Sequence, residues 1–270
     1  MKHDLPPRVL TIAGSDSGGG AGIQADLKTI LAMDGYGMSA ITALTAQNTR
    51  EVSAVRSVPP AFVREQIKTV ISDIGIDAAK TGMLHSAPVV RAVADAAEEF
   101  HITNLVVDPV MIAKSGAELL DEKAVTVLRD TLLPLSTVLT PNLPEARALA
   151  GRDVDSPRKR RDAAAALIDM GAKTVLIKGG HLREEPVDLF YDGRDFHELK
   201  YSRVDTDNTH GTGCTYSAAI ATGLGRGMEP FDAVTVARAK LQRAIENALP
   251  LGKGHGPLDH RAMRDIEREQ

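Results

Sequence analysis

Short β-rich runs alternate with segments of helical periodicity along this chain, and that alternation constrains its fold more than any other feature. Residues 9–13 are β-rich, and after a glycine-rich loop apolar residues recur from Ile23 to Leu31 at the spacing of one helical face. The patterns predict further strands at residues 39–44, 105–107, 138–140 and 174–178, a helix around residues 125–132, and helices that begin near Pro59, Ser86, Ser156, Gly213 and Phe231. Repeated strand–helix units imply right-handed crossovers. We therefore expect an α/β fold with a central, mostly parallel sheet flanked by helices on both faces.

The composition is consistent with one α/β domain over residues 1–270. Aromatic residues make up only 3% of the chain and tryptophan is absent, so the core must be built from Val, Ile, Leu, Ala and Met, as in parallel sheets buried between helices. Residues 187–201 depart from the pattern, because they read as two extended runs around Asp192 and Gly193 and predict a hairpin. No internal repeat or linker divides the sequence.

The charge balance and the single cysteine exclude several classes of protein. The chain carries 32 Lys and Arg against 36 Asp and Glu, a net charge of −4, and so lacks the basic excess that nucleic-acid binding requires. No run approaches the roughly 20 apolar residues of a membrane span, and residues 1–7 lack the apolar run of a signal peptide, so we expect a cytoplasmic protein. Cys214 alone supports neither a disulfide framework nor a multi-cysteine zinc site.

A glycine-rich loop at residues 13–22 leads from the first expected strand into the first helix. Glycines let the backbone approach a ligand closely, and a helix N-terminus favours an anion or a polar ring. Residues 20–25 also match the G-x-G-x-x-A pattern of dinucleotide-binding folds, but they lie too far from the strand and no acidic residue clearly ends the next strand. A nicotinamide oxidoreductase is therefore a poor interpretation, whereas a simple turn that needs positive φ angles remains an alternative.

Residues 205–214 carry the sharpest local signal. Polar residues give way to Gly211, Thr212 and Gly213, and an alanine-rich helix follows. The amides of these three residues would point outward at the helix start and form a cradle for a phosphate in transfer. Cys214 would stand in the first turn, where the helix dipole lowers the pKa of a thiol and makes it a possible base. A lone cysteine is more often a small buried hydrophobe, but its position behind the glycines favours a functional role.

Polar side chains also follow other expected strands. Asn142 and Glu145 would share one side of a helical first turn, where their oxygens suit Mg²⁺ on a nucleotide, although the same pair is typical of a helix cap. Asp108 would serve the same metal or merely turn the chain before Pro109. Lys178 would reach the crevice where ligands bind in α/β proteins, unless it is a solvated surface lysine.

The motifs follow one another in an order that covers nearly the whole chain: residues 12–29, 41–49, 80–84, 108–111, 140–146, 177–181, 210–214 and 252–257. In this combination they resemble the hydroxymethylpyrimidine/phosphomethylpyrimidine kinases, which are thiamine-pathway members of the ribokinase superfamily. The resemblance implies a ribokinase-like fold. It also implies ATP- and Mg²⁺-dependent phosphorylation of 4-amino-5-hydroxymethyl-2-methylpyrimidine, and then of its monophosphate to the diphosphate.

For the substrate, the resemblance implies that Gln47 reads the aminopyrimidine edge through paired hydrogen bonds. The same pocket would be lined by Gly14, Asp26, Met83 and Val110. Superfamily members commonly dimerise, so a homodimer is expected.

For the phosphates, the resemblance implies that Lys178 holds ATP and that Asn142, Glu145 and Asp108 organise Mg²⁺. Thr140 and Gly213 would add nucleotide contacts. The amides of residues 211–213 would neutralise charge in the transition state, and Cys214 would face the substrate hydroxymethyl group as base. Most ribokinase-like sugar kinases carry Asp at this position, so the thiol points to the vitamin-kinase branch.

Two alternatives stay open at this level. Pyridoxal kinases share the fold and, in some members, the cysteine, and a pyridine ring with a hydroxymethyl group could enter the same pocket, although Gln47 favours the aminopyrimidine. A non-catalytic protein with a kinase-like fold would be indicated by the loss of Cys214, Lys178 or the Gly-Thr-Gly run, and all of these are present.

Overall fold

The computed structural model describes residues 5–112, 116, 119–180 and 185–265. Its strands are β1 (Arg8–Ser15), β2 (Tyr36–Gln47), β3 (Val52–Ser57), β4 (Ala78–Thr81), β5 (Leu105–Val107), β6 (Val138–Leu139), β7 (Val175–Ile177), β8 (Val187–Tyr191) and β9 (Phe196–Lys200). Within the described residues these nine strands form one sheet in the order β3-β2-β1-β4-β5-β6-β7-β8-β9. The strands from β2 to β7 in this order are parallel, and antiparallel pairing among the described strands occurs only where β3 joins β2 and in the β7–β8–β9 edge. The mostly parallel sheet is confirmed.

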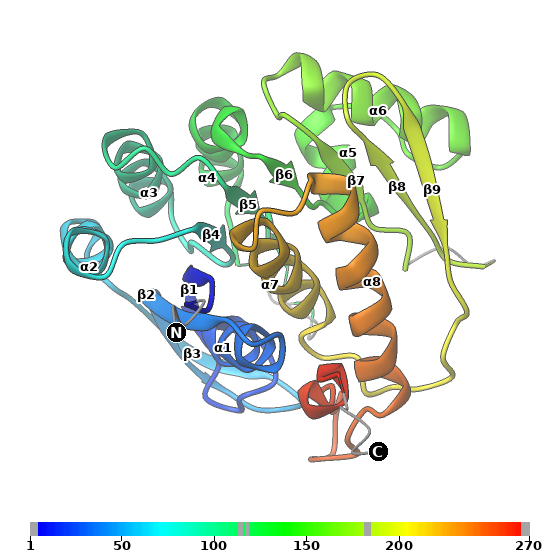
Figure 1. Ribbon diagram of the computed structural model, residues 1–270, viewed down its shortest axis with the longest axis horizontal. Helices are drawn as coiled ribbons and strands as arrows, with labels where there is room; N and C mark the ends of the chain where they lie inside the picture. Colours follow the sequence, from blue (N-terminus) through cyan, green and yellow to red (C-terminus); the bar gives the residue numbers. More distant parts are fainter. Residues whose placement is uncertain (1–4, 113–115, 117–118, 181–184, 266–270) are drawn as a thin grey trace.

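Helices cover both faces of the sheet, as Figure 1 shows. They are α1 (Gly22–Ala32), α2 (Pro60–Asp73), α3 (Ala87–Glu99), α4 (Glu122–Val127), α5 (Leu143–Ala150), α6 (Pro157–Asp169), α7 (Thr212–Gly225) and α8 (Pro230–Glu246), with shorter helical turns at Leu128–Leu132, Leu133–Leu135 and His260–Met263. The Ser–Pro signals mark helix starts as predicted. Ser156 caps α6 by accepting a hydrogen bond from the Lys159 amide at 3.3 Å, and Pro88 stands in the first turn of α3.

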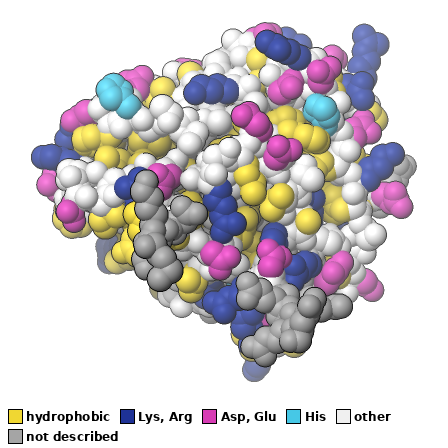
Figure 2. Space-filling view, in the orientation of Figure 1, with side chains coloured by type: hydrophobic (Ala, Val, Ile, Leu, Met, Phe, Trp, Pro, Cys, Tyr) yellow, Lys and Arg dark blue, Asp and Glu magenta, His cyan; other side chains and the backbone are white. Residues whose placement is uncertain are grey.

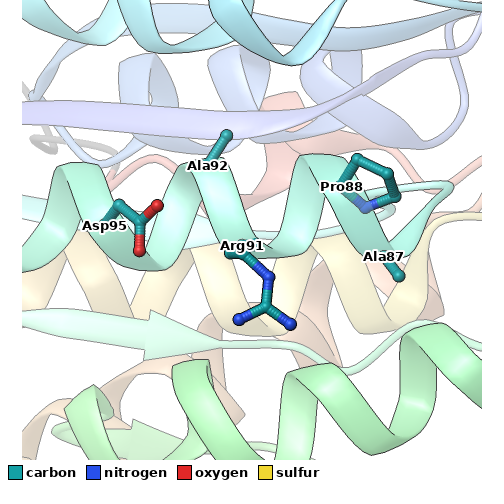
Figure 3. Close-up of a pocket in the computed structure, with 5 residues that line it drawn as sticks. All are labelled: Ala87, Pro88, Arg91, Ala92 and Asp95. Carbon is teal, nitrogen blue, oxygen red and sulfur yellow. The ribbon is translucent and has the colours of Figure 1, made fainter.

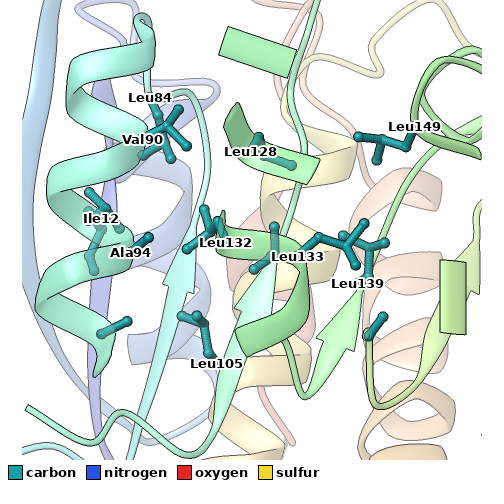
Figure 4. Close-up of a cluster of buried hydrophobic side chains, with 14 of the residues drawn as sticks. Ile12, Leu84, Val90, Ala94, Leu105, Leu128, Leu132, Leu133, Leu139 and Leu149 are labelled. Atoms are coloured by element: carbon teal, nitrogen blue, oxygen red, sulfur yellow. The ribbon is translucent and has the colours of Figure 1, made fainter. Parts of the chain in front are cut away.

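Each central strand contributes side chains to two separate apolar cores, because successive side chains point to opposite faces of the sheet. In β5, Leu105 and Val107 belong to the core under α2 to α6, whereas Val106 belongs to the core under α1, α7 and α8. Figure 4 shows the first of these cores, where Leu105, Leu132 and Leu139 lie together. Side chains buried on both faces explain why these strands read as continuous hydrophobic runs.

The structure adds elements that the sequence patterns did not predict. β3 and β4 are new, and β2 begins before and ends after the predicted residues 39–44. The predicted helix around residues 125–132 exists, but it widens into a π-turn at Leu128 and tightens before Pro134. Proline lacks the amide that an α-helix needs at this point, so the regular hydrogen-bond ladder ends there.

Described side chains of both charge signs are interspersed over the side of the molecule shown in Figure 2. Among the helices described, none has the length and apolar character needed to cross a membrane.

Candidate active site

A cavity of about 920 Å³ lies at the carboxyl ends of the parallel strands. Ser15 ends β1 there, Asp108 follows β5, Asn142 follows β6 and Lys178 follows β7. Ligands bind at this edge in open α/β sheets. The cavity brings together most of the predicted site residues: Gly14, Gln47, Met83, Asp108, Val110, Asn142, Glu145, Lys178, Gly211, Thr212, Gly213 and Cys214.

Asp26 and Thr140 do not reach the cavity wall. Asp26 is fully buried on α1, where Lys80 Nζ lies 2.9 Å from its Oδ2 and the Thr11 hydroxyl donates to the same oxygen at 2.6 Å. Burial raises the pKa of Asp26, and the adjacent Lys80 ammonium partly offsets this rise. Lys80 does not line the cavity, but its ammonium group pairs with Asp26 and attracts the Asp108 carboxylate. The sequence patterns did not predict this role. Thr140 is likewise buried, and its hydroxyl donates to Asp108 Oδ1 at 3.3 Å.

Asp108 and Lys178 form an ion pair in the cavity wall, in which Asp108 is buried and Lys178 is partly exposed. Lys178 Nζ donates to Asp108 Oδ1 at 2.8 Å, and Ser217 donates to Asp108 Oδ2 at 3.2 Å. Burial alone would raise the pKa of Asp108, but the ammonium groups of Lys178 and Lys80 outweigh it and hold that pKa below its usual value. The site therefore holds a carboxylate and an ammonium group ready to meet a charged ligand.

Asn142 and Glu145 form the capping box that stood as the alternative to metal binding. Asn142 Oδ1 accepts from the Glu145 amide at 2.9 Å, and Glu145 Oε2 accepts from the Asn142 amide at 2.7 Å. Burial raises the pKa of Glu145 to about 7, the nearby Asp108 carboxylate adds to the rise, and Lys178 at 4.0 Å opposes it. The pKa of Glu145 thus lies well above that of an ordinary glutamate.

The glycine turn before α7 is held against the first loop. Gly211 caps α7 with a φ angle of 84°, and a Cβ on it would lie 1.9 Å from the carbonyl oxygen of Gly20. The Thr212 amide does not point free as predicted, because it donates to Thr209 O at 3.3 Å. The predicted phosphate cradle would therefore depend on the amides of Gly211 and Gly213 more than on that of Thr212.

The pocket wall near Gln47 rests on two residues whose roles were not predicted. His210 Nε2 lies 2.9 Å from Asp16 Oδ2 and 3.3 Å from Gln47 Nε2. Asp16 also accepts from the amides of residues 18, 20 and 21, so it holds the glycine-rich loop in place. Asp16 and His210 both lie within the motifs on which the family resemblance rests. Those motifs were the sequence evidence that could have pointed to them.

Gly14 and Met83 form the adjoining wall. The Gly14 amide donates to Met83 O at 3.1 Å, and a Cβ on Gly14 would lie 2.2 Å from Met83 Cε. The thioether therefore packs directly over the glycine backbone beside the cavity.

A polar cluster lines the far end of the cavity, and no sequence motif signals it because its members are distant in the chain. The Arg238 guanidinium lies 3.9 Å from the centroid of the Tyr201 ring, and the Tyr201 hydroxyl donates to Asp188 at 3.1 Å. Asp188 also accepts from the Gly179 amide at 2.7 Å and so fixes the backbone that follows Lys178. His181, part of the motif at residues 177–181, lies outside the described residues.

Cys214 lies in the first turn of α7 and lines the cavity as predicted, but its pKa moves in the opposite direction. Burial raises the pKa of the thiol to about 11, and the Asp26 and Asp108 carboxylates add to this, while Lys80 opposes it. The helix dipole is too weak to offset these effects, so the thiol is neutral at neutral pH.

We expect iodoacetamide to alkylate Cys214 about 100-fold more slowly near neutral pH than a thiol of ordinary pKa, because a rise of about two units lowers the thiolate fraction by that factor. The rate should increase roughly tenfold per pH unit up to a pH of about 11. Intact-mass measurement follows the reaction cleanly, since the chain has one cysteine. A rate that levels off at mildly alkaline pH would contradict the raised pKa.

A second hollow, of about 420 Å³, lies on α3. Figure 3 shows the residues that line it: Ala87, Pro88, Arg91, Ala92 and Asp95. All five come from one helix, and no second element brings a polar group to converge with them among the lining residues. The chemistry therefore belongs to the larger cavity.

The fold and the larger cavity together define a small-molecule kinase of the ribokinase-like class. The Asp108–Lys178 ion pair and the glycine turn before α7 line the same cavity, and positioned charges of this kind suit the transfer of a phosphoryl group. The profile of the family described as phosphomethylpyrimidine kinase matches residues 16–259, and the chain belongs to this family.

Two curated relatives give the extent of the similarity. The chain is 46% identical over 259 residues to the hydroxymethylpyrimidine/phosphomethylpyrimidine kinase of Bacillus subtilis, a match that covers 95% of this chain and 96% of the relative. It is 51% identical over 253 residues to the thiamine biosynthesis bifunctional protein of Geobacter sulfurreducens, where the match covers 93% of this chain and 52% of the relative. The chain thus spans about half the length of that bifunctional protein.

Solved structures with this fold come from both vitamin-kinase groups. The pyridoxal kinase of Staphylococcus aureus in complex with AMP-PCP and pyridoxal superposes with a TM-score of 0.88 at 38% identity, over 97% of each chain. The phosphomethylpyrimidine kinase of Clostridium difficile superposes with a TM-score of 0.80 at 40% identity, over 88% of this chain and 99% of the other. The ribokinase-like fold predicted from the resemblance is confirmed.

Proposed function

We propose that this protein transfers the γ-phosphoryl group of ATP to the hydroxymethyl group of 4-amino-5-hydroxymethyl-2-methylpyrimidine, and then phosphorylates the monophosphate to the diphosphate. One cavity is lined by Gln47 as well as by Lys178 and the turn at residues 211–213, and this observation is the main support for the proposal. An amide suited to an aminopyrimidine edge and a site suited to phosphates thus share one space. Membership of the family supports this assignment.

At the pyrimidine end, the carboxamide of Gln47 offers one donor and one acceptor, which matches the amino group and ring nitrogen of the substrate. Its Oε1 lies 3.3 Å from the Thr45 hydroxyl and its Nε2 lies 3.3 Å from His210, so the side chain is held from two sides. Met83 and Val110 supply apolar surface in the same cavity. This end would orient the hydroxymethyl group toward Cys214.

At the phosphate end, Lys178 would neutralise the transferring group and the amides of the glycine turn would bind its oxygens. In this reaction the substrate oxygen bonds to the γ-phosphorus, the bond from phosphorus to the bridging oxygen breaks, and ADP leaves. The transition state requires little covalent help, so positioning and charge do most of the catalysis.

Magnesium fits the oxygen-rich floor of the cavity. Asp108 and Glu145 are buried carboxyl groups on either side of Lys178, and Asn142 adds an amide oxygen, which are the donor types that Mg²⁺ accepts through water. When bound with ATP, the ion would neutralise phosphate charge. Because the pKa of Glu145 is raised, a cation bound there would compete with its proton and would lower that pKa.

Cys214 is the candidate acceptor for the proton of the substrate hydroxyl group. Only its thiolate can take that proton, and the raised pKa makes the thiolate a minor species at neutral pH. The cysteine would therefore contribute less than Lys178 does, and its contribution should grow as pH rises.

Pyridoxal phosphorylation is the second candidate function. It is favoured by the superposition with the pyridoxal kinase that was solved with pyridoxal and AMP-PCP. A pyridine ring lacks the amino group that Gln47 would read, so we expect it to be the slower substrate.

ADP release with Mg·ATP tests the proposal when hydroxymethylpyrimidine, its monophosphate and pyridoxal are offered in parallel. We expect turnover of both pyrimidines, with pyridoxal at least about tenfold lower in kcat/KM, since one unpaired polar edge costs roughly 1–3 kcal/mol. Turnover of pyridoxal alone would move the protein to vitamin B6 salvage and remove the role given to Gln47. No turnover of any of the three would refute the proposed function.

We further propose that residues 1–270 form one domain and that two copies associate in the cytoplasm. All strands of the described residues share one sheet, which supports a single domain. At one edge of that sheet β3 has an open side, and Leu44 on the adjoining β2 is 51% exposed. The mass of the protein in solution tests the dimer.

A further inference from the structure

The segment at residues 252–257 is part of the motif set, yet none of the roles above uses it. It follows α8 and lies mostly exposed on the surface, where it passes between two turns that border the cavity. One is the β2–β3 turn, which begins just after Gln47. The other is the approach to α7, which contains His210. We call residues 252–257 the clasp.

On one side, the clasp encloses Thr49 of the β2–β3 turn. The amides of Lys253 and Gly254 donate to Thr49 Oγ1 at 3.2 and 3.1 Å, and the His255 amide donates to Thr49 O at 2.9 Å. A Cβ on Gly254 would lie 2.1 Å from Thr49 O. The glycine is required here because two backbones touch, and the Thr49 hydroxyl collects two otherwise unpaired amides.

On the other side, the clasp holds the segment that leads into the glycine turn. The Gly256 amide donates to Asn208 Oδ1 at 3.1 Å, and the His210 amide donates to Gly256 O at 3.1 Å. The His255 ring donates from Nδ1 to Asp207 O at 3.0 Å. A Cβ on Gly256 would lie 2.4 Å from both Asn208 Oδ1 and the Leu249 carbonyl oxygen. The clasp backbone therefore leaves no room for a side chain here, as at Gly254.

We propose that Thr49 is a positioning residue, which acts through the clasp to hold the pyrimidine-reading end of β2 in register with the turn before α7. Gln47 is two residues from Thr49, and the His210 side chain that contacts Gln47 belongs to the segment that the clasp holds. Two parts of the cavity wall that come from opposite ends of the chain are thus fixed by one short segment. This inference rests on the proposed function for its kinetic consequence.

The clasp can affect the position of Gln47 while contributing little to the stability of the fold. Its hydrogen bonds to the Thr49 hydroxyl are exposed, and it adds no side chain to either apolar core. Such a contact opens locally at a cost below that of global unfolding. Loss of the Thr49 hydroxyl should therefore loosen Gln47 while the sheet remains intact.

Amide hydrogen exchange on the full chain tests the contact itself. In Thr49→Val, exchange at residues 253–255 and at His210 should become about tenfold faster, because the acceptor of two hydrogen bonds is lost while side-chain volume is kept. Thr49→Ser should retain the protection. Ser53→Ala is the matched control, since it removes an exposed hydroxyl of the same hairpin that donates to Ala46 O at 3.0 Å, away from the clasp.

Kinetics then test the positioning role. Thr49→Val should raise the KM for hydroxymethylpyrimidine about fivefold to tenfold and leave the KM for ATP within about twofold, with Thr49→Ser close to the original protein. Unchanged exchange in Thr49→Val, an unchanged pyrimidine KM, or an equal rise of both KM values would each overturn the proposal. If the original protein turned over no pyrimidine, the proposed function would fail separately, and exchange at His210 would still decide whether the clasp couples the two turns.

Discussion

Replacing Lys178 by methionine should lower kcat about 10³-fold while the protein remains folded. The ammonium group is the partner of Asp108 at 2.8 Å and lies 4.0 Å from Glu145. Without it, the phosphates of ATP would approach the Asp108 carboxylate without the ammonium group that neutralises it. The loss therefore combines missing attraction with new repulsion, which is why this change should exceed the effect of removing a single amide of the cradle.

The matched control is Lys173→Met, which removes an exposed lysine shortly before the same strand, at the end away from the cavity. Steady-state ADP release at saturating ATP measures kcat, and thermal unfolding of both variants measures stability. We expect a loss of less than about 3 kcal/mol in Lys178→Met, since Asp108 keeps its bonds from Thr140 and Ser217 and borders a cavity that water can enter.

A double variant separates the two contributions. Lys178→Met combined with Asp108→Asn relieves the repulsion but also removes a carboxylate proposed to hold Mg²⁺, so a partial recovery of kcat would show that the repulsion outweighs the lost Mg²⁺ contact. A fall of less than tenfold in Lys178→Met itself would show that this ammonium group does not act on the transferring phosphate.

The parts of the site that could be predicted from sequence are those fixed by local geometry. Asp108, Asn142 and Lys178 each follow a buried strand, and the ends of parallel strands meet at one edge whatever the details of the fold. The turn at residues 211–213 was likewise visible, because its glycines and the following helix lie in one short segment. These residues converge in the structure on a single cavity.

What could not be predicted depends on partners that are distant in sequence. β4 reads Ala-Ala-Lys-Thr, which has neither the β-branched run nor the alternation of a strand. Its Lys80 is fully buried, and the ionic partner Asp26 is 54 residues away in the chain. The raised pKa of Cys214 has the same origin. Its position in the helix was local, but its burial and the carboxylates around it were set by the tertiary fold.

Replacing Gly211, the residue that caps the start of α7, by alanine should reduce kcat/KM at least about 10²-fold. Alanine would be strained at a φ of 84°, and its Cβ would meet the carbonyl oxygen of Gly20 at 1.9 Å, so either the glycine-rich loop or the cradle must move. A displacement of about 1 Å is enough to take backbone amides out of reach of a transition-state oxygen.

Gly227→Ala separates strain from displacement. Gly227 also has a φ of 84°, follows the same helix and has no described atom within 4 Å of where a Cβ would lie, so alanine there imposes the backbone cost without a collision. Both variants should lose about 1–2 kcal/mol of stability from the left-handed backbone. Only Gly211→Ala should also lose activity, measured as kcat/KM for ADP release below the unfolding temperature of each variant. Equal activity of the two variants would mean that the contact between Gly20 and Gly211 does not position the cradle, and the amides of the turn would then have no part in holding the transferred phosphate.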